Sequence, residues 1–129
     1  MPNSNLHRKP HIYLVDDDES ARKSLKRLLA SLKYEVDVFL SGQGFLDSVP
    51  ADAQGVLLLD FYMPNLSGLA VQEKLNAMHS KLKVIFITGS AQTNERDLVM
   101  RSGAHGFLQK PFDENSLLEL INSATASSN

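Results

Sequence analysis

The sequence predicts an α/β protein in which a doubly wound sheet of five parallel strands carries helices on both faces. Three observations lead to this prediction. Five short apolar segments alternate with five segments of helical periodicity along the 129 residues. The first, third and fourth apolar segments are continuous, which is typical of strands buried on both faces of a parallel sheet. No internal repeat or low-complexity block interrupts the alternation, so strand–helix units of one sheet explain the whole pattern.

Composition supports one globular domain and excludes several kinds of site. Apolar residues make up 43% of the chain and charged residues 22%, with a net charge of -2. A dedicated nucleic-acid binder usually carries a clear basic excess, which is missing here. The absence of cysteine excludes disulfides, zinc–thiolate sites and a thiol nucleophile. No apolar run is long enough to span a membrane and the first residues do not resemble a signal peptide, so we expect a cytoplasmic protein.

The N-terminal third predicts a flexible arm, two strands and a helix. Residues 1–10 are polar, and we expect them to precede the domain as an arm. HIYLV, at 11–15, is the first buried strand. From Ser20, apolar residues recur at helical spacing as far as Leu32. EVDVF, at 35–39, alternates and predicts a strand with one more polar face.

Small polar residues mark the starts of the remaining helices. The further strands are expected at residues 55–60, 82–88 and 106–109. The expected helices run from Ser41 to Val49, from Ser67 to about Met78, from Thr93 or Asn94 to Gly103, and from Asp113 with Leu117, Leu118 and Ile121 inward. NSATASSN, the polar C-terminal segment, predicts a frayed tail or the start of a linker. We therefore place the domain at residues 11–124 and a tail at 125–129.

Polar side chains stand at the carboxyl ends of four predicted strands. Asp16 to Asp18 follow the first strand, Asp60 ends the third, Thr88 ends the fourth and Lys110 follows the fifth. The carboxyl ends of parallel strands share one edge of a sheet, where ligands of such folds bind. Each residue alone has an ordinary interpretation, such as an acid that favours a helix N-terminus. Their joint occurrence predicts a functional site.

The chemistry of this set suits phosphoryl transfer. Carboxylates about 5 Å apart repel by roughly 3 kcal/mol per pair at an effective dielectric near 20, so a cation must offset them. A hard, oxygen-binding ion such as Mg²⁺ fits that requirement. A metal ion and a lysine can neutralise phosphoryl oxygens while a carboxylate acts as the nucleophile. A calcium loop starting at Asp16 is excluded, because Ala21 and Arg27 occupy the places of its glycine and glutamate.

Four motifs in order resemble the response-regulator receiver domain of two-component signalling: LVDDDE, LLLDFYMPNLSG, FITGSA and GFLQKPF. The resemblance covers about residues 10 to 124 and implies a flavodoxin-like sheet with strand order 2-1-3-4-5. Asp60 would accept a phosphoryl group from a sensor histidine kinase. Asp16 and Asp17, with Asp60 and the backbone carbonyl of Tyr62, would hold Mg²⁺. Such a domain is a signalling phosphoacceptor, which catalyses only its own phosphorylation and dephosphorylation.

The resemblance also implies a conformational switch. Thr88 and Lys110 would bind the phosphoryl oxygens, and Phe107 matches the aromatic switch position. Phosphorylation would draw the Thr88 hydroxyl inward and let Phe107 turn in. This would change the surface formed by the fourth helix, the fifth strand and the fifth helix, a plausible homodimer surface. Because the lysine must turn back toward the site, we expect a cis peptide bond between Lys110 and Pro111.

The resemblance further implies a slow loss of the phosphoryl group. Tyr62 and Ser90 would flank the path along which water attacks the phosphorus. Tyr62 is large and Ser90 is a poor base, so neither activates water. We expect slow self-dephosphorylation with Tyr62 as the main barrier to water.

MPNLSGLAVQEKL and DDDESARKSL are most similar to receivers of nitrogen-fixation-type regulators, which usually carry a LuxR-type helix-turn-helix domain. The output would then be transcription, with DNA bound only through a domain that this sequence lacks. The sequence is compatible with a stand-alone receiver and with a fragment of a longer regulator.

Two other functions compete with this interpretation. A haloacid-dehalogenase-type phosphatase also uses a strand-end aspartate, Mg²⁺, a hydroxyl and a lysine, but its nucleophile follows the first strand and it needs a late acidic pair. Here the only acidic residues between residues 85 and 112 are Glu95 and Asp97, and neither ends a predicted strand. A phosphorylation-independent interaction module on the same fold would be favoured by loss of Asp17, Asp60 or Lys110, and all three are present.

Overall fold

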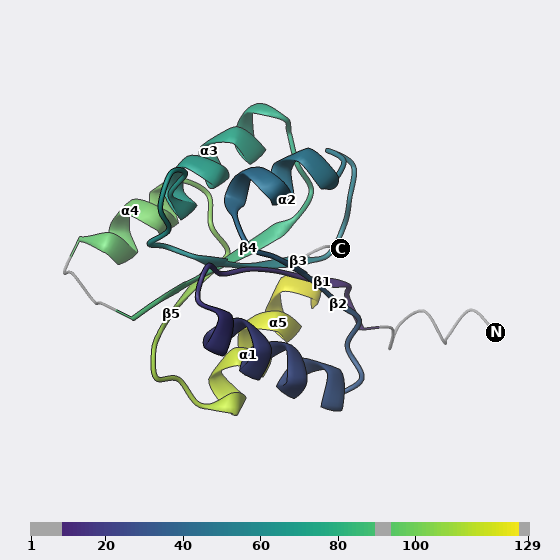
Figure 1. Cartoon of the computed structure of the whole chain (residues 1–129). Helices are drawn as coiled ribbons and strands as arrows, with labels where there is room; N and C mark the ends of the chain where they lie inside the picture. Colours follow the sequence, from purple (N-terminus) through teal and green to yellow (C-terminus); the bar gives the residue numbers. More distant parts are fainter. Residues whose placement is uncertain (1–8, 90–93, 127–129) are drawn as a thin grey trace.

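The computed structural model describes residues 9–89 and 94–126, and these form the predicted doubly wound sheet. Five strands pair in parallel in the order β2-β1-β3-β4-β5 (Figure 1). The strands are β1 (Ile12–Val15), β2 (Val36–Phe39), β3 (Val56–Asp60), β4 (Lys83–Thr88) and β5 (Gly106–Gln109). The helices are α1 (Glu19–Ser31), α2 (Gly42–Ser48), α3 (Gly68–Ala77), α4 (Glu95–Arg101) and α5 (Glu114–Ala126).

The sheet separates two hydrophobic cores. In Figure 1, α1 and α5 cover one face, while α2, α3 and α4 cover the other. Successive residues of β3 point to opposite faces, so Leu58 packs in the first core and Leu57 and Leu59 in the second. All five β3 residues are buried, which explains why this strand is continuously apolar up to Asp60.

Side-chain caps begin α2 and α3 at the serines that the sequence predicted. The Ser41 Oγ accepts a hydrogen bond from the Gly44 N–H at 3.0 Å, and the Ser67 Oγ accepts one from the Ala70 N–H at 3.2 Å. Asp18 caps α1, two residues before the predicted start at Ser20. Asn94 opens α4 without a side-chain cap bond. The alternative start at Thr93 lies outside the described residues, as do residues 1–8 of the expected arm.

The C-terminal segment is more ordered than its composition indicates. We expected the segment from Asn122 to be a frayed tail or the start of a linker and placed the end of the domain at residue 124. In the structure, residues 122–126 continue α5, so the helix extends two residues past that boundary. Ala124 is fully buried against the first core. A small apolar residue at helical spacing from Leu117 and Ile121 extends the inward face of the helix, and this packing outweighs the polar neighbours.

Candidate functional site

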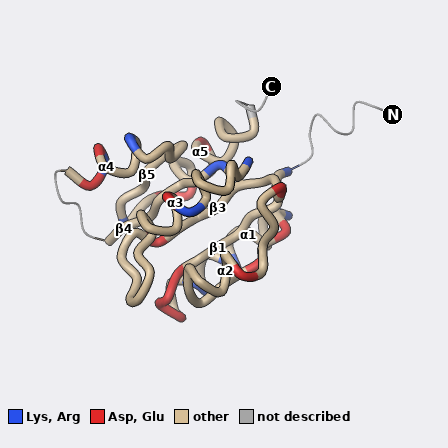
Figure 2. Tube along the Cα trace, turned by 90° about the horizontal axis from the view of Figure 1, so that it is seen from above, with Lys and Arg blue, Asp and Glu red and all other residues tan. Residues whose placement is uncertain are grey.

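Three carboxylates meet at the carboxyl edge of the sheet, as the sequence predicted. Oxygen atoms of Asp16, Asp17 and Asp60 all lie within 4.8 Å of one another. The register explains the convergence, since Val15 of β1 is paired with Leu59 of β3. The residues that follow these two in the chain are Asp16 and Asp60. Asp18 lies outside this cluster and caps α1 instead. In Figure 2 the four consecutive acidic residues that follow β1 form a continuous red segment.

The loop after β3 turns away so that the Asp60 side chain stays at the site. The Phe61 N–H donates to the Ile87 carbonyl at 2.9 Å, and the Gly68 N–H donates to the Phe61 carbonyl at 3.1 Å. A Cβ atom on Gly68 would lie 2.4 Å from the Asp60 carbonyl oxygen. Only glycine therefore permits this close approach of α3 to the end of β3.

Asp16 is the most enclosed of the three acids and is held from three sides. It is 2% exposed, and its Oδ1 accepts a hydrogen bond from the Asp18 N–H at 2.9 Å. Its Oδ2 pairs with the Lys110 Nζ at 3.3 Å, and its carbonyl accepts a bond from the Arg22 guanidinium at 3.0 Å. Lys110 thus reaches from the end of β5 across the site to the end of β1.

The backbone directs Lys110 toward the acids. Its N–H donates to the Thr88 carbonyl at 2.7 Å, which continues the β4–β5 pairing by one residue. The peptide bond between Lys110 and Pro111 is cis, which confirms the prediction.

Electrostatics at Asp60 favour the protonated acid in the absence of a cation. Burial and the neighbouring Asp16 charge raise the pKa of Asp60 from 3.8 to about 7, and Lys110 opposes this rise only in part. The Tyr62 N–H donates to the Asp60 Oδ1 at 3.4 Å, a long bond that stabilises the charged form weakly. The site therefore carries an unbalanced negative charge that a cation would offset.

The donor set fits the Mg²⁺ ion that the sequence implied. All three clustered groups are carboxylates, the hard oxygen ligands that Mg²⁺ binds in small numbers together with water. Burial raises the pKa of Asp60 most, and the neighbouring charge of Asp16 adds to the rise, as expected for a buried acid beside another without a counter-ion. Asp16, Asp17 and Asp60 would hold the ion, and the backbone carbonyl of Tyr62 remains a predicted fourth ligand.

The two residues of the expected switch lie on neighbouring strands. Thr88 ends β4 and is fully buried, one residue beyond the Asp60–Ile87 pair. Phe107 lies on β5 opposite Phe86 and is packed, partly exposed, against the second core. Thr88 is thus at the site, while Phe107 lies two positions before the end of β5. Ser90 lies outside the described residues.

One contact at this edge was missed at the sequence level. The Tyr62 hydroxyl donates a hydrogen bond to Oε2 of Glu95, the first residue of α4. The hydrogen bond to Glu95 raises the pKa of Tyr62. An acid in the first turn of a helix is normally explained by its favourable interaction with the helix dipole, which does not require burial. The sequence therefore gave no indication that the Glu95 side chain is only 3% exposed.

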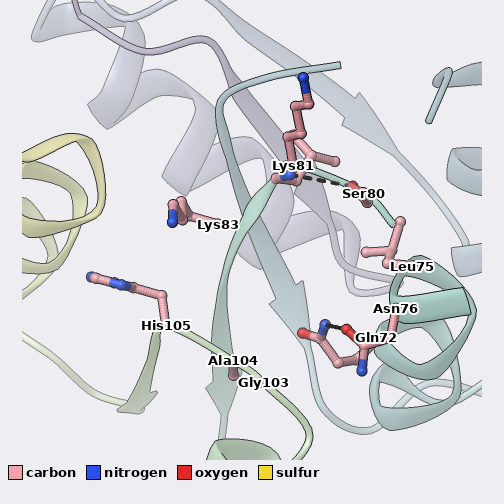
Figure 3. Close-up of a pocket in the computed structure, with 10 residues that line it drawn as sticks. Gln72, Leu75, Asn76, Ser80, Lys81, Lys83, Gly103, Ala104 and His105 are labelled. Atoms are coloured by element: carbon pink, nitrogen blue, oxygen red, sulfur yellow. Dashed lines mark hydrogen bonds between the residues drawn. The ribbon is translucent and has the colours of Figure 1, made fainter. Parts of the chain in front are cut away.

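A cavity of about 370 Å³ lies at the opposite edge of the sheet (Figure 3). Residues from the end of α3, the start of β4 and the turn before β5 line it. Asn76 holds two of these elements together, because its Nδ2 donates to the Ser102 carbonyl at 2.7 Å. Gln72 donates to the Asn76 Oδ1 at 2.9 Å. The cavity contains none of the predicted site residues.

Comparisons with known proteins agree with the geometry. Residues 12–122 match the family model described as the response regulator receiver domain. The transcriptional regulatory protein FixJ of Bradyrhizobium diazoefficiens is 36% identical over 116 residues, which are 90% of this chain and 57% of FixJ. The response regulator protein TmoT of Ectopseudomonas mendocina is 39% identical over 113 residues, 88% of this chain and 51% of TmoT.

Solved structures with a similar fold come from the same group of proteins. The crystal structure of FixJ-N superposes with a TM-score of 0.86 at 31% identity and covers 92% of this chain and 95% of that structure. The chain spans about half the length of the curated relatives it matches. Among the described helices, none is long and apolar enough to cross a membrane.

Proposed function

Because the chain belongs to the response regulator receiver domain family of two-component signalling, we propose that Asp60 is its phosphoacceptor. The observation that carries the proposal is the cluster of Asp16, Asp17 and Asp60 with Lys110 across it. The competing interpretation as a haloacid-dehalogenase-type phosphatase finds no support in the family match.

The residues divide the reaction between them. An Asp60 carboxylate oxygen attacks the phosphorus of a phosphohistidine on a sensor histidine kinase, the phosphorus–nitrogen bond breaks, and an acyl phosphate forms. Lys110 and the Thr88 hydroxyl bind phosphoryl oxygens. Mg²⁺, when bound, supplies positive charge to the acids and to the phosphoryl oxygens. Asp16 pairs with Lys110 and holds its Nζ within reach of the transferred group.

The output follows from a change of packing around β4 and β5. Contact of Thr88 with the phosphoryl group moves its hydroxyl toward Asp60, and Phe107 turns into the space that is freed. The surface of α4, β5 and α5 then changes and supports a homodimer. Such a switch needs a phosphoryl group that binds one packing better than the other.

The partners are proposed by analogy with the relatives. FixJ and TmoT bear the names of a transcriptional regulatory protein and a response regulator. We place this receiver in the cytoplasm, downstream of a histidine kinase, with transcription as its output. DNA would be bound through an output domain and not through the receiver.

A small phosphodonor tests the proposal. Incubation with phosphoramidate and Mg²⁺, followed by intact mass, should show one stable phosphoryl group on the wild type and none on Asp60→Asn. Equal phosphorylation of both proteins would show that Asp60 is not the acceptor. Continuous phosphate release at enzyme rates would favour a phosphatase, and no phosphorylation with or without Mg²⁺ would favour an interaction module.

A further inference from the structure

Glu95 is a buried acid with an incomplete set of partners. Its side chain opens α4 and is 3% exposed. Oε2 accepts the hydrogen bond from the Tyr62 hydroxyl, while Oε1 has no hydrogen-bond partner within the described residues. A buried carboxylate is costly unless hydrogen bonds compensate it. Among the described residues, the Tyr62 hydroxyl is therefore the hydrogen-bond donor that stabilises the Glu95 side chain at the start of α4.

Tyr62 is anchored at both ends. Its N–H donates to the Asp60 Oδ1, and its ring lies edge-on against Phe61 with 4.8 Å between the ring centroids. The side chain is nevertheless 50% exposed, so packing alone does not fix the ring. The hydroxyl bond to Glu95 is the contact that fixes its far end.

The course of the Tyr62 side chain follows from the strand order. β4 is the neighbour of β3, and α4 follows β4 in the chain (Figure 1). A side chain that begins just after β3 and ends at the first residue of α4 spans the carboxyl end of β4. Thr88 lies at that end, one residue beyond Ile87, which is paired with Asp60. The ring therefore borders the site on the side of Thr88.

We infer that Glu95 is a positioning residue, whose hydrogen bond holds the Tyr62 ring across the path of water to a phosphoryl group on Asp60. The inference rests on the proposed function and names what sets the lifetime of its product. In the step that is slowed, a water oxygen attacks the phosphorus and the bond to the Asp60 oxygen breaks. The Asp60 carboxylate and inorganic phosphate are released, and the protons of water pass to phosphate and solvent. Because the anchor is on α4, a partner that moves α4 away from the loop would release the ring.

Three variants of the whole chain test the inference. Tyr62→Phe keeps the ring and removes the hydroxyl, Glu95→Gln keeps the shape and removes the charge, and the double variant removes both. Asp97→Asn is the matched control, since it neutralises an exposed acid in the same first turn of α4. Each protein is phosphorylated with phosphoramidate and Mg²⁺, freed of donor, and followed by intact mass.

Loss of the anchor should shorten the lifetime of the phosphoryl group by about threefold to tenfold, where tenfold is about 1.4 kcal/mol of barrier. The double variant should decay no faster than the faster single variant, because both changes act on the same hydrogen bond: Tyr62→Phe removes its donor and Glu95→Gln replaces its charged acceptor with a neutral, weaker one. Asp97→Asn should keep the wild-type lifetime. If a variant only destabilised the fold, its urea midpoint would fall, but its phosphoryl lifetime would not follow this order among the single, double and control variants.

A spectroscopic readout reports the contact without phosphorylation. The chain has three tyrosines and no tryptophan, so ¹³C-labelled tyrosine gives few signals. Glu95→Gln should shift the Tyr62 signal and leave those of Tyr13 and Tyr34 in place. Wild-type lifetimes in both single variants, or an unshifted Tyr62 signal, would overturn the inference. Failure of the wild type to become phosphorylated would instead refute the proposed function and, with it, the inference.

Discussion

Replacing Asp60 with asparagine should stabilise the fold at neutral and alkaline pH. The folded protein raises the pKa of Asp60 from 3.8 to about 7, through burial and the charge of Asp16. A raised pKa means that the folded state binds the Asp60 proton more tightly than the unfolded state does. Between about pH 4 and pH 7 the folded state holds one more proton at this residue, so the free energy of unfolding falls as pH rises.

The magnitude follows from the two pKa values. The difference between 3.8 and about 7 corresponds to about 4 kcal/mol, at about 1.4 kcal/mol for each tenfold change in proton affinity. Asparagine is uncharged and avoids this cost, which already includes the opposing attraction to Lys110 and the hydrogen bond from the Tyr62 N–H. We therefore expect Asp60→Asn to gain up to about 4 kcal/mol at pH 8.

Urea unfolding from pH 4 to pH 8, with a chelator present, measures the effect. The difference between Asp60→Asn and wild type should grow from about pH 4 to pH 7 and then stay constant. Asp52→Asn is the control, since Asp52 is an exposed acid and its variant should stay within about 0.5 kcal/mol of wild type. A variant that is less stable than wild type at pH 8, or a difference that does not change with pH, would refute the reasoning.

Three further perturbations test the site. Gly68→Ala should destabilise the fold by about 2 kcal/mol or more in urea unfolding, because its Cβ would meet a backbone oxygen at 2.4 Å. Gly89→Ala is the control and should be neutral, since its Cβ would have no atom of the described residues within 4 Å. Lys110→Met should slow phosphorylation by phosphoramidate at least tenfold in a timed mass assay, since the transferred group loses its fixed cation, and an unchanged rate would remove this residue from the site. The double variant Tyr62→Asn, Ser90→Glu should shorten the phosphoryl lifetime about tenfold or more, or about 1.4 kcal/mol, and a lifetime that is unchanged or longer would show that water access does not limit the rate.

The sequence could predict the site because the site residues stand at strand ends. Parallel strands bring their carboxyl ends to one edge, so Asp16, Asp60 and Lys110 meet once the strands are recognised. Helix starts were predictable for a similar reason, since Ser41 and Ser67 act on N–H groups three residues away. These signals are local and need no knowledge of tertiary packing.

The contacts that escaped prediction depend on tertiary packing. Tyr62 and Glu95 are 33 residues apart, and neither is unusual in its own segment. Glu95 is buried because α4 lies beside the loop after β3. Neither the hydrophobic periodicity of α4 nor its capping residues indicate this arrangement. The extension of α5 to Ala126 is similar, because the burial of Ala124 decides it against polar neighbours.

The acidic cluster joins the stability of the fold to its chemistry. Burial and the charge of Asp16 together raise the pKa of Asp60 to about 7, and the same two effects contribute to the binding free energy of a divalent cation, because the ion compensates the buried charge and removes the repulsion between Asp16 and Asp60. A cation at 100 times its dissociation constant stabilises the native state by about 2.7 kcal/mol, of the same order as the cost of the charged Asp60. Mg²⁺ should therefore raise the urea midpoint of the wild type at pH 8 and bring it toward that of Asp60→Asn, which loses one ligand and should respond less. If Mg²⁺ raised the urea midpoints of both proteins equally, Asp60 would not be a ligand of the metal ion. The raised pKa of Asp60 would then be unrelated to metal binding.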